Sequence, residues 1–148
     1  MDQSIDKIAK GANAANAARV PAAAGRMYPA EPAALTRSLS ELFASVKRRV
    51  FARPPLLLIA PHSALEKSGA VAASVYSSLL GQKYDVVVII APSHSGHFPG
   101  VSVFSGESYE TPLGTIPVDT SLVSGLGDLS PAVFSSTKEH IGGDHGKE

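Results

Sequence analysis

Two short apolar runs, each closed by a proline, constrain the fold of this chain more than any other feature. They are residues 56–60, followed by Pro61, and residues 86–91, followed by Pro92. Neither run alternates between apolar and polar residues, which is typical of strands buried on both faces of a parallel sheet. Each is far shorter than the roughly 20 residues that a membrane-spanning helix needs. The runs therefore predict two buried strands of a globular domain.

The segment between the runs predicts a helix that joins them. Ser68 is a suitable N-cap, and Gly81 can end the helix. Between them, Val71, Val75 and Leu79 fall four residues apart and form an apolar stripe. Parallel strands need a crossover connection, usually a helix, so this order predicts a right-handed βαβ unit. We expect an α/β fold with a parallel-sheet core.

The elements on either side of this unit are less strongly marked. Residues 32–50 carry apolar side chains at helical spacing, and the basic residues 47–49 suit the C-terminal end of a helix, where the dipole favours cations. Residues 101–104 and 115–118 are short strand candidates, and Asp119 or the threonine after it can cap a short helix. With only two strong parallel strands, the sheet is expected to leave an edge open to self-association.

The composition excludes several classes of function. The 148 residues include 13 basic and 13 acidic side chains, and this net charge of zero gives no field that attracts nucleic acid or an anionic membrane. The chain has no cysteine, so it offers no disulfide and no thiolate ligand, and histidine and carboxylate must supply any metal ligands. Residues 1–18 lack the apolar core of a signal peptide and read as a flexible leader. We expect a cytoplasmic protein, by elimination.

Two histidines follow the predicted strands directly. His62 comes after Pro61, and His94 comes two residues after Pro92. Ligands of open α/β sheets bind beyond the carboxyl ends of the strands, so both imidazoles are expected to face one crevice, as metal ligands or as a general base. A non-haem metal needs at least a third protein ligand. The other pocket candidates are His97, Glu139 and His140, with Asp144 and His145 further along.

Five separated motifs occur in a fixed order along the chain. They are VPAAAGRMYP at 20–29, APH at 60–62 with SG at 68–69, APSH at 91–94, TPLG at 111–114 and EH at 139–140. In this order they resemble the MEMO family, also described as protein B of the AmmeMemoRadiSam system, over about residues 19–140. The resemblance implies a fold like that of the class III extradiol dioxygenases, which are non-haem iron enzymes.

The resemblance also implies a metal site. It assigns His62 and His94 as ligands of iron or copper, together with a cysteine from the second half of the family fold. Residues 63–67 read SALEK and lack the glycine and the two tyrosines that the family usually has there, and Ala91 replaces a usual glycine. These departures alter the polarity and the turn of the expected pocket.

The similarity to the family ends just after Glu139-His140, where relatives continue into a second half. Residues 141–148 match nothing in the family pattern. We therefore expect residues 19–140 to be the N-terminal part of a MEMO-like domain, truncated or frameshifted, with residues 141–148 as a non-family tail. The metal site is expected to be incomplete, and iron or copper to bind weakly if at all.

Three functional readings stay open at this point. The first is a MEMO-like metal protein that binds a small molecule, for which the resemblance supplies no secure reaction, so whether it is an enzyme is left open. The alternative is a signalling module that binds a peptide in the pocket without metal chemistry. A product without activity is the third. Alanine replacement of His62 and His94 separates the first two, because only a metal protein depends on both imidazoles.

Overall fold

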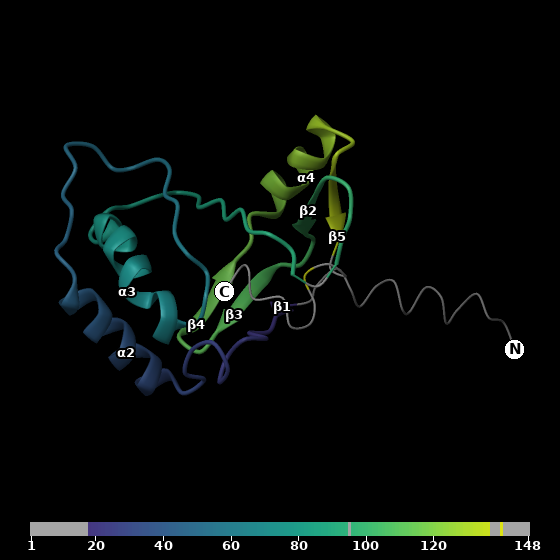
Figure 1. Ribbon diagram of the computed structural model, residues 1–148. Coiled ribbons are helices and arrows are strands. Elements are labelled where there is room, and N and C mark those ends of the chain that lie inside the picture. Colours follow the sequence, from purple (N-terminus) through teal and green to yellow (C-terminus); the bar gives the residue numbers. More distant parts are fainter. Residues whose placement is uncertain (1–17, 95, 137–139, 141–148) are drawn as a thin grey trace, which may run out of the picture. The chain divides into compact units, whose positions relative to one another are not determined.

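The computed structural model describes residues 18–94, 96–136 and 140 (Figure 1). These residues form two compact units. The helical unit comprises residues 23–91, and the sheet unit comprises the described residues of 1–22 and 92–144. Apart from Ala18, the predicted leader lies outside the described residues, as does the predicted tail.

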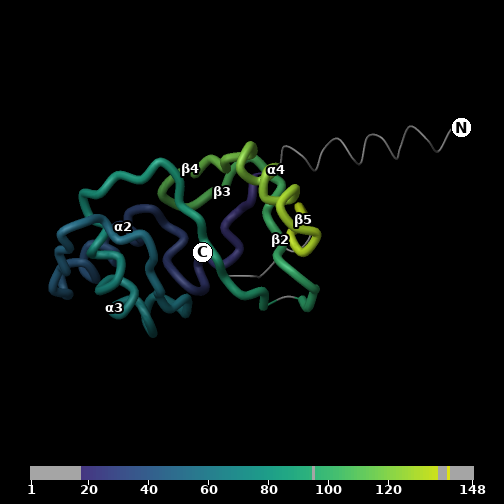
Figure 2. Tube along the Cα trace, turned by 90° about the horizontal axis from the view of Figure 1, so that it is seen from above, coloured from purple at the N-terminus to yellow at the C-terminus, as the bar shows by residue number. Residues whose placement is uncertain are grey.

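The helical unit is built on two helices that pack side by side (Figure 1, Figure 2). They are α2, Pro32–Ser45, and α3, Leu65–Tyr76, which continues into the short 3-10 helix η1, Ser77–Leu79. Pro32 occupies the first helical position, where its missing N–H costs nothing. Leu35 of α2 is buried, as the apolar spacing of this segment predicts.

A small residue of α3, Gly69, lies at the contact with α2. Gly69, Ala73 and Ser77 are four residues apart and are all buried. A Cβ atom added to Gly69 would lie 2.8 Å from Cδ1 of Leu42, so the glycine lets the two helices approach closely. Val71 lies on the opposite side of α3 and is exposed. Val75 and Leu79, the other members of the predicted apolar stripe, are half-buried.

The ends of both helices differ from the prediction. The helix α2 stops at Ser45, so residues 47–49 follow the helix instead of forming its last turn. The guanidinium of Arg48 donates a hydrogen bond to the Leu80 carbonyl, which joins the segment after α2 to the end of α3. The helix α3 starts at Leu65, three residues before the predicted N-cap.

The two apolar runs are not strands in this structure, which corrects the predicted βαβ unit. Residues 56–60 and 86–90 carry no regular secondary structure, and Figure 1 draws them as coil. Leu56 is 97% exposed and Ile90 is 89% exposed. A wholly apolar strand is stable only with neighbours at its edges and cover on both faces. No strand in the described part of the chain pairs with either run.

The sheet unit contains two small sheets and one helix. Its elements are β1 Ala18–Arg19, β2 Val101–Phe104, β3 Ser108–Thr111, β4 Gly114–Pro117, α4 Thr120–Leu129 and β5 Val133–Ser136. One sheet has the order β1-β3-β4, in which β1 and β3 are parallel and β3 and β4 form an antiparallel hairpin. The other sheet is the parallel pair of β2 and β5. A mixed α/β structure with parallel strand pairs is thus confirmed, although the pairs are not the predicted ones.

A tight turn joins β3 and β4 of the hairpin. The hydroxyl of Thr111 accepts a hydrogen bond from the Leu113 amide at 3.1 Å and donates one to the Gly114 carbonyl at 2.9 Å. Gly114 has φ of +135°, which side-chain-bearing residues rarely adopt. The predicted strand 101–104 is confirmed as β2, and the prediction 115–118 agrees with β4 within one residue.

The buried apolar core of the described residues is small. It consists of Ala23, Leu35, Ala73 and Phe104, of which only the last belongs to the sheet unit. Many larger apolar side chains are exposed instead, most of all along the two apolar runs. No helix in the described ranges is both long and apolar enough to cross a membrane.

Candidate functional site

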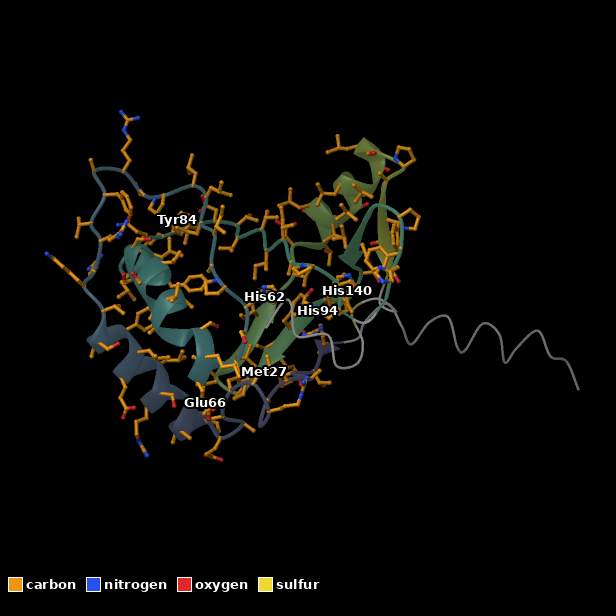
Figure 3. The ribbon with its side chains drawn as sticks, viewed as in Figure 1. Met27, His62, Glu66, Tyr84, His94 and His140 are labelled. Atoms are coloured by element: carbon orange, nitrogen blue, oxygen red, sulfur yellow. The ribbon has the colours of Figure 1, made fainter. Side chains whose placement is uncertain are left out.

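The two predicted ligands have exposed side chains. His62 follows the first apolar run in the helical unit, three residues before α3 begins (Figure 3). His94 follows the second run and belongs to the sheet unit. Because the two histidines belong to different units, their convergence on one crevice stays a prediction.

A turn within the family motif at 20–29 fixes the start of α3 and so the segment that carries His62. The amide of Gly25 donates to the Tyr28 carbonyl at 2.7 Å, and Gly25 has φ of +78°. The Met27 carbonyl then accepts the Leu65 amide at 2.9 Å, which satisfies one of the unpaired N–H groups of the first turn of α3. Met27 and Glu66 both lie at this end of the helix in Figure 3.

The residue beside His94 carries an unusual polar atom. The hydroxyl oxygen of Ser93 is buried and has no hydrogen-bond partner within the described part of the chain. Leaving such a group unpaired costs about 1–3 kcal/mol, so native structures seldom keep one. A ligand or another polypeptide segment could supply the hydrogen-bond partner that this hydroxyl lacks among the described residues.

Of the remaining candidates, only His97 and His140 are among the described residues. His97 is exposed in the loop before β2, and Glu139, Asp144 and His145 lie outside the described residues. Among the described residues, no group of three or more His, Cys, Asp or Glu side chains could hold a metal ion. The third ligand that the chemistry requires is thus not supplied by the described part of the chain.

His140 has a different environment from the other histidines. It is buried in the sheet unit, and its Nε2 atom lies 3.0 Å from the Ser102 hydroxyl of β2. Arg19 of β1 donates from Nε to the His140 carbonyl at 2.7 Å. The Phe104 ring packs at 5.5 Å, centroid to centroid, from the imidazole. These contacts tie residue 140 to β1 and β2 of the sheet unit.

Tyr109 completes the cluster around Arg19. The guanidinium carbon lies 5.7 Å from the centre of the Tyr109 ring, and the Phe104 ring packs at 5.0 Å from the same ring. Burial raises the pKa of the Tyr109 phenol, and the charge of Arg19 opposes part of that rise. Sequence reasoning missed Arg19, Ser102 and Tyr109, because no spacing pattern signals a contact across 121 residues such as that between Arg19 and His140.

Two open depressions lie away from the candidate ligands. One of about 600 Å³ in the helical unit is lined by Val46, Lys47, Arg48, Arg49, Val50, Phe51 and Ser74. A smaller one of about 330 Å³ in the sheet unit is lined by Ser105, Gly106, Thr120, Val123, Ser124, Gly127 and Ser135. Neither is lined by a histidine, so neither corresponds to the predicted metal pocket.

Comparison with known proteins gives a consistent result. A family model described as "Memo-like protein" matches residues 19–145. A MEMO1 family protein of Methanosarcina barkeri is 41% identical over 108 residues, which are 73% of this chain and 39% of the relative. One of Methanosarcina mazei is 39% identical over 115 residues, 77% of this chain and 41% of the relative. One of Metallosphaera sedula is 33% identical over 133 residues, which are 83% of this chain and 47% of the relative. The chain spans less than half the length of these relatives.

Proposed function

This chain belongs to the Memo-like family, and from that premise we propose that it supplies two histidine ligands, His62 and His94, to a non-haem metal site. One observation carries the proposal: each histidine is exposed directly after an apolar run that a proline closes. The buried Ser93 hydroxyl, which lacks a partner among the described residues, adds a polar group next to His94. A fold like that of the class III extradiol dioxygenases is part of this proposal.

The residues fit a metal in kind but not in number. Imidazole is a common ligand of iron, copper and zinc, and two neutral imidazoles leave the charge of the ion uncompensated. The described residues bring no third ligand to them. A bound iron or copper ion with open positions would supply Lewis-acid or redox chemistry for a small-molecule substrate. On this chain alone, the two histidines are expected to hold such an ion weakly.

Titration of the full chain with Cu(II), and with Fe(II) under anaerobic conditions, tests the proposal. We expect less than one tightly held ion per chain, and EDTA should remove what is bound. Replacing His62→Ala or His94→Ala should weaken binding by about tenfold or more, since each removes one of only two ligands. Isothermal calorimetry gives the affinities, and the charge-transfer and d-d bands of Cu(II) report the ligand set.

Asp128→Ala is the matched control, because Asp128 is an exposed residue of α4 that is not among the candidate ligands and should leave binding unchanged. Equal binding by all four proteins would overturn the metal role and leave the peptide-binding alternative. A stoichiometric ion that resists EDTA would instead show that the site is complete on this chain.

A further inference from the structure

The charge of this chain is unevenly distributed along the sequence. Residues 23–91 carry eight basic and four acidic side chains, which gives the helical unit a formal charge of +4, although the whole chain is neutral. Four of these basic residues lie at positions 47, 48, 49 and 53, and no acidic residue occurs between Glu41 and Glu66. A local excess of positive charge attracts anionic ligands even where the net charge of the chain is zero.

The basic run 47–49 lines a depression instead of ending a helix. The helix α2 stops at Ser45, so the three cations lie beyond its last turn. Their side chains line the depression of about 600 Å³ in the helical unit, which we call the basic depression. Among the described residues, no acidic side chain lines it, and the other lining residues are three apolar ones and Ser74. Its volume lies within the range of small-molecule pockets, about 300–1,000 Å³.

The Arg48 side chain is held in place within this depression. Its guanidinium donates a hydrogen bond to the Leu80 carbonyl at the end of α3. A guanidinium has five N–H donors, so this bond leaves others able to bind a ligand. Its planar fork matches two oxygens of one phosphate group. Because the side chain is already anchored, less conformational entropy is lost when an anion binds to it.

Phe51 adds a second kind of contact to the basic depression. Its ring lines the same depression and is 52% exposed. An aromatic ring beside basic side chains is the combination that binds nucleotides, since the ring stacks on the base while the cations contact the phosphates. An inorganic anion would contact the cations alone and would leave this ring uncovered.

We propose that the basic depression binds a nucleoside polyphosphate, with the phosphates on the basic run 47–49 and the base stacked on Phe51. Three cations compensate a chain of phosphates better than a single phosphate, so a triphosphate should bind more tightly than a monophosphate. A single-stranded nucleic acid or an acidic peptide would need a row of cations beyond the depression. The other basic residues of the helical unit outside 47–53 are instead scattered singly along the sequence: Arg26, Arg37, Lys67 and Lys83.

This proposal is independent of the metal site, because neither His62 nor His94 lines the basic depression. Isothermal calorimetry with the full chain in metal-free buffer compares ATP, AMP, inorganic triphosphate and adenosine. We expect one ATP per chain, with AMP and inorganic triphosphate weaker by about fivefold or more and adenosine without measurable binding. Raising NaCl from 50 mM to 500 mM should weaken ATP binding by about fivefold or more, because salt screens exposed charges.

Two substitutions separate the contacts to the phosphates from the contact to the base. Arg49→Gln should weaken both ATP and inorganic triphosphate by about tenfold. Phe51→Ala should lower the affinity for ATP to that for inorganic triphosphate and leave the latter unchanged. Both side chains are exposed, so neither substitution removes a buried contact of the fold.

Arg37→Gln is the matched control, because it removes an exposed cation of α2 that does not line the basic depression, and it should leave ATP binding unchanged. Phe51→Tyr keeps the aromatic ring and should also retain binding, as should His62→Ala. Absence of ATP binding at millimolar concentration overturns the proposal. Equal affinities for ATP and inorganic triphosphate, or an unchanged affinity for ATP in Phe51→Ala, overturn it too. Tighter binding of a single-stranded 12-mer oligonucleotide or of a glutamate-rich peptide than of ATP overturns it in favour of that partner.

Discussion

Arg19 is a charged side chain that the sheet unit buries, and burial of a charge is costly unless the charge is paired. Two contacts offset that cost. Its Nε atom donates to the His140 carbonyl, and its guanidinium lies over the Tyr109 ring. The Arg19 side chain therefore links β1, at the start of the described residues, to His140 at their end. His140 in turn contacts Ser102 of β2. His140 is thus held by structural contacts.

The ionisation of Tyr109 makes this cluster sensitive to alkaline pH. Burial raises the phenol pKa above its ordinary value of 10.0, so the folded sheet unit favours the neutral ring. Below pH 10 the phenol is neutral in both the folded and the unfolded chain, so its ionisation does not change the free energy of unfolding. As the pH rises through 10 and beyond, the unfolded chain ionises first, so the free energy of unfolding falls. Denaturant titrations between pH 8 and 11 should show that the free energy of unfolding falls less in the Tyr109→Phe variant than in the unaltered chain. Tyr76→Phe is the control, because it alters an exposed ring, and its free energy of unfolding should fall as much as that of the unaltered chain.

Gly100, just before β2, lies close to the backbone of Ala132, just before β5. It has φ of +91°, and an added Cβ would collide with the Ala132 carbonyl oxygen, which already accepts the Val101 amide at 2.7 Å. Gly100→Ala should therefore destabilise the sheet unit by about 2 kcal/mol or more, through backbone strain and displacement of β5. Gly125→Ala is the control: it lies in α4 with open space around it and should stabilise by roughly 0.5–1 kcal/mol. Equal unfolding midpoints for the two variants would contradict this geometry.

The helix α4 depends on a cap that the sequence identifies correctly. The Asp119 carboxylate accepts a hydrogen bond from the Ser121 hydroxyl at 2.6 Å and from the Leu122 amide at 3.0 Å. The hydroxyl of Ser121, followed by the Leu122 amide, holds the pKa of this carboxyl below its ordinary 3.8. Because the pKa is lowered in the folded chain, the ionised cap contributes its full stabilisation above pH 3.8. This stabilisation is lost as the pH falls through the lower pKa of the folded chain.

Ser121→Ala should accordingly raise the Asp119 pKa toward 3.8, as measured by NMR titration of the carboxyl carbon. Asp119→Asn keeps an acceptor for the Leu122 amide, so it should retain α4 and remove this part of the acid dependence. An unchanged Asp119 pKa in Ser121→Ala would show that the serine hydroxyl does not hold the carboxylate.

Local signals explain which elements the sequence could predict. Apolar spacing predicts helices in the segments of α2, α3 and α4, and all three are confirmed, although the ends of α2 and α3 differ from the prediction by several residues. The strand β3 was missed because its residues, Ser-Tyr-Glu-Thr, are mostly polar, and it forms through pairing with β1 and β4. The runs 56–60 and 86–90 were predicted as strands for their composition alone. A strand also needs partners, which no local pattern can supply.

The same distinction applies to the candidate site. The sequence could place His62 and His94 directly after the apolar runs, because the order of residues fixes that position. It could not bring them together, since convergence depends on strands that the described residues do not form. The environment of His140 was equally hidden, because its partners come from strands more than 30 residues away.

The described residues bury few large apolar side chains, and they form two compact units. Because so few large apolar side chains are buried, the chain should unfold over a broad temperature range, with a van't Hoff enthalpy well below the calorimetric enthalpy. The exposed runs should also bind the dye ANS before unfolding begins. A sharp transition without dye binding by the chain alone would mean that the runs are already covered in solution.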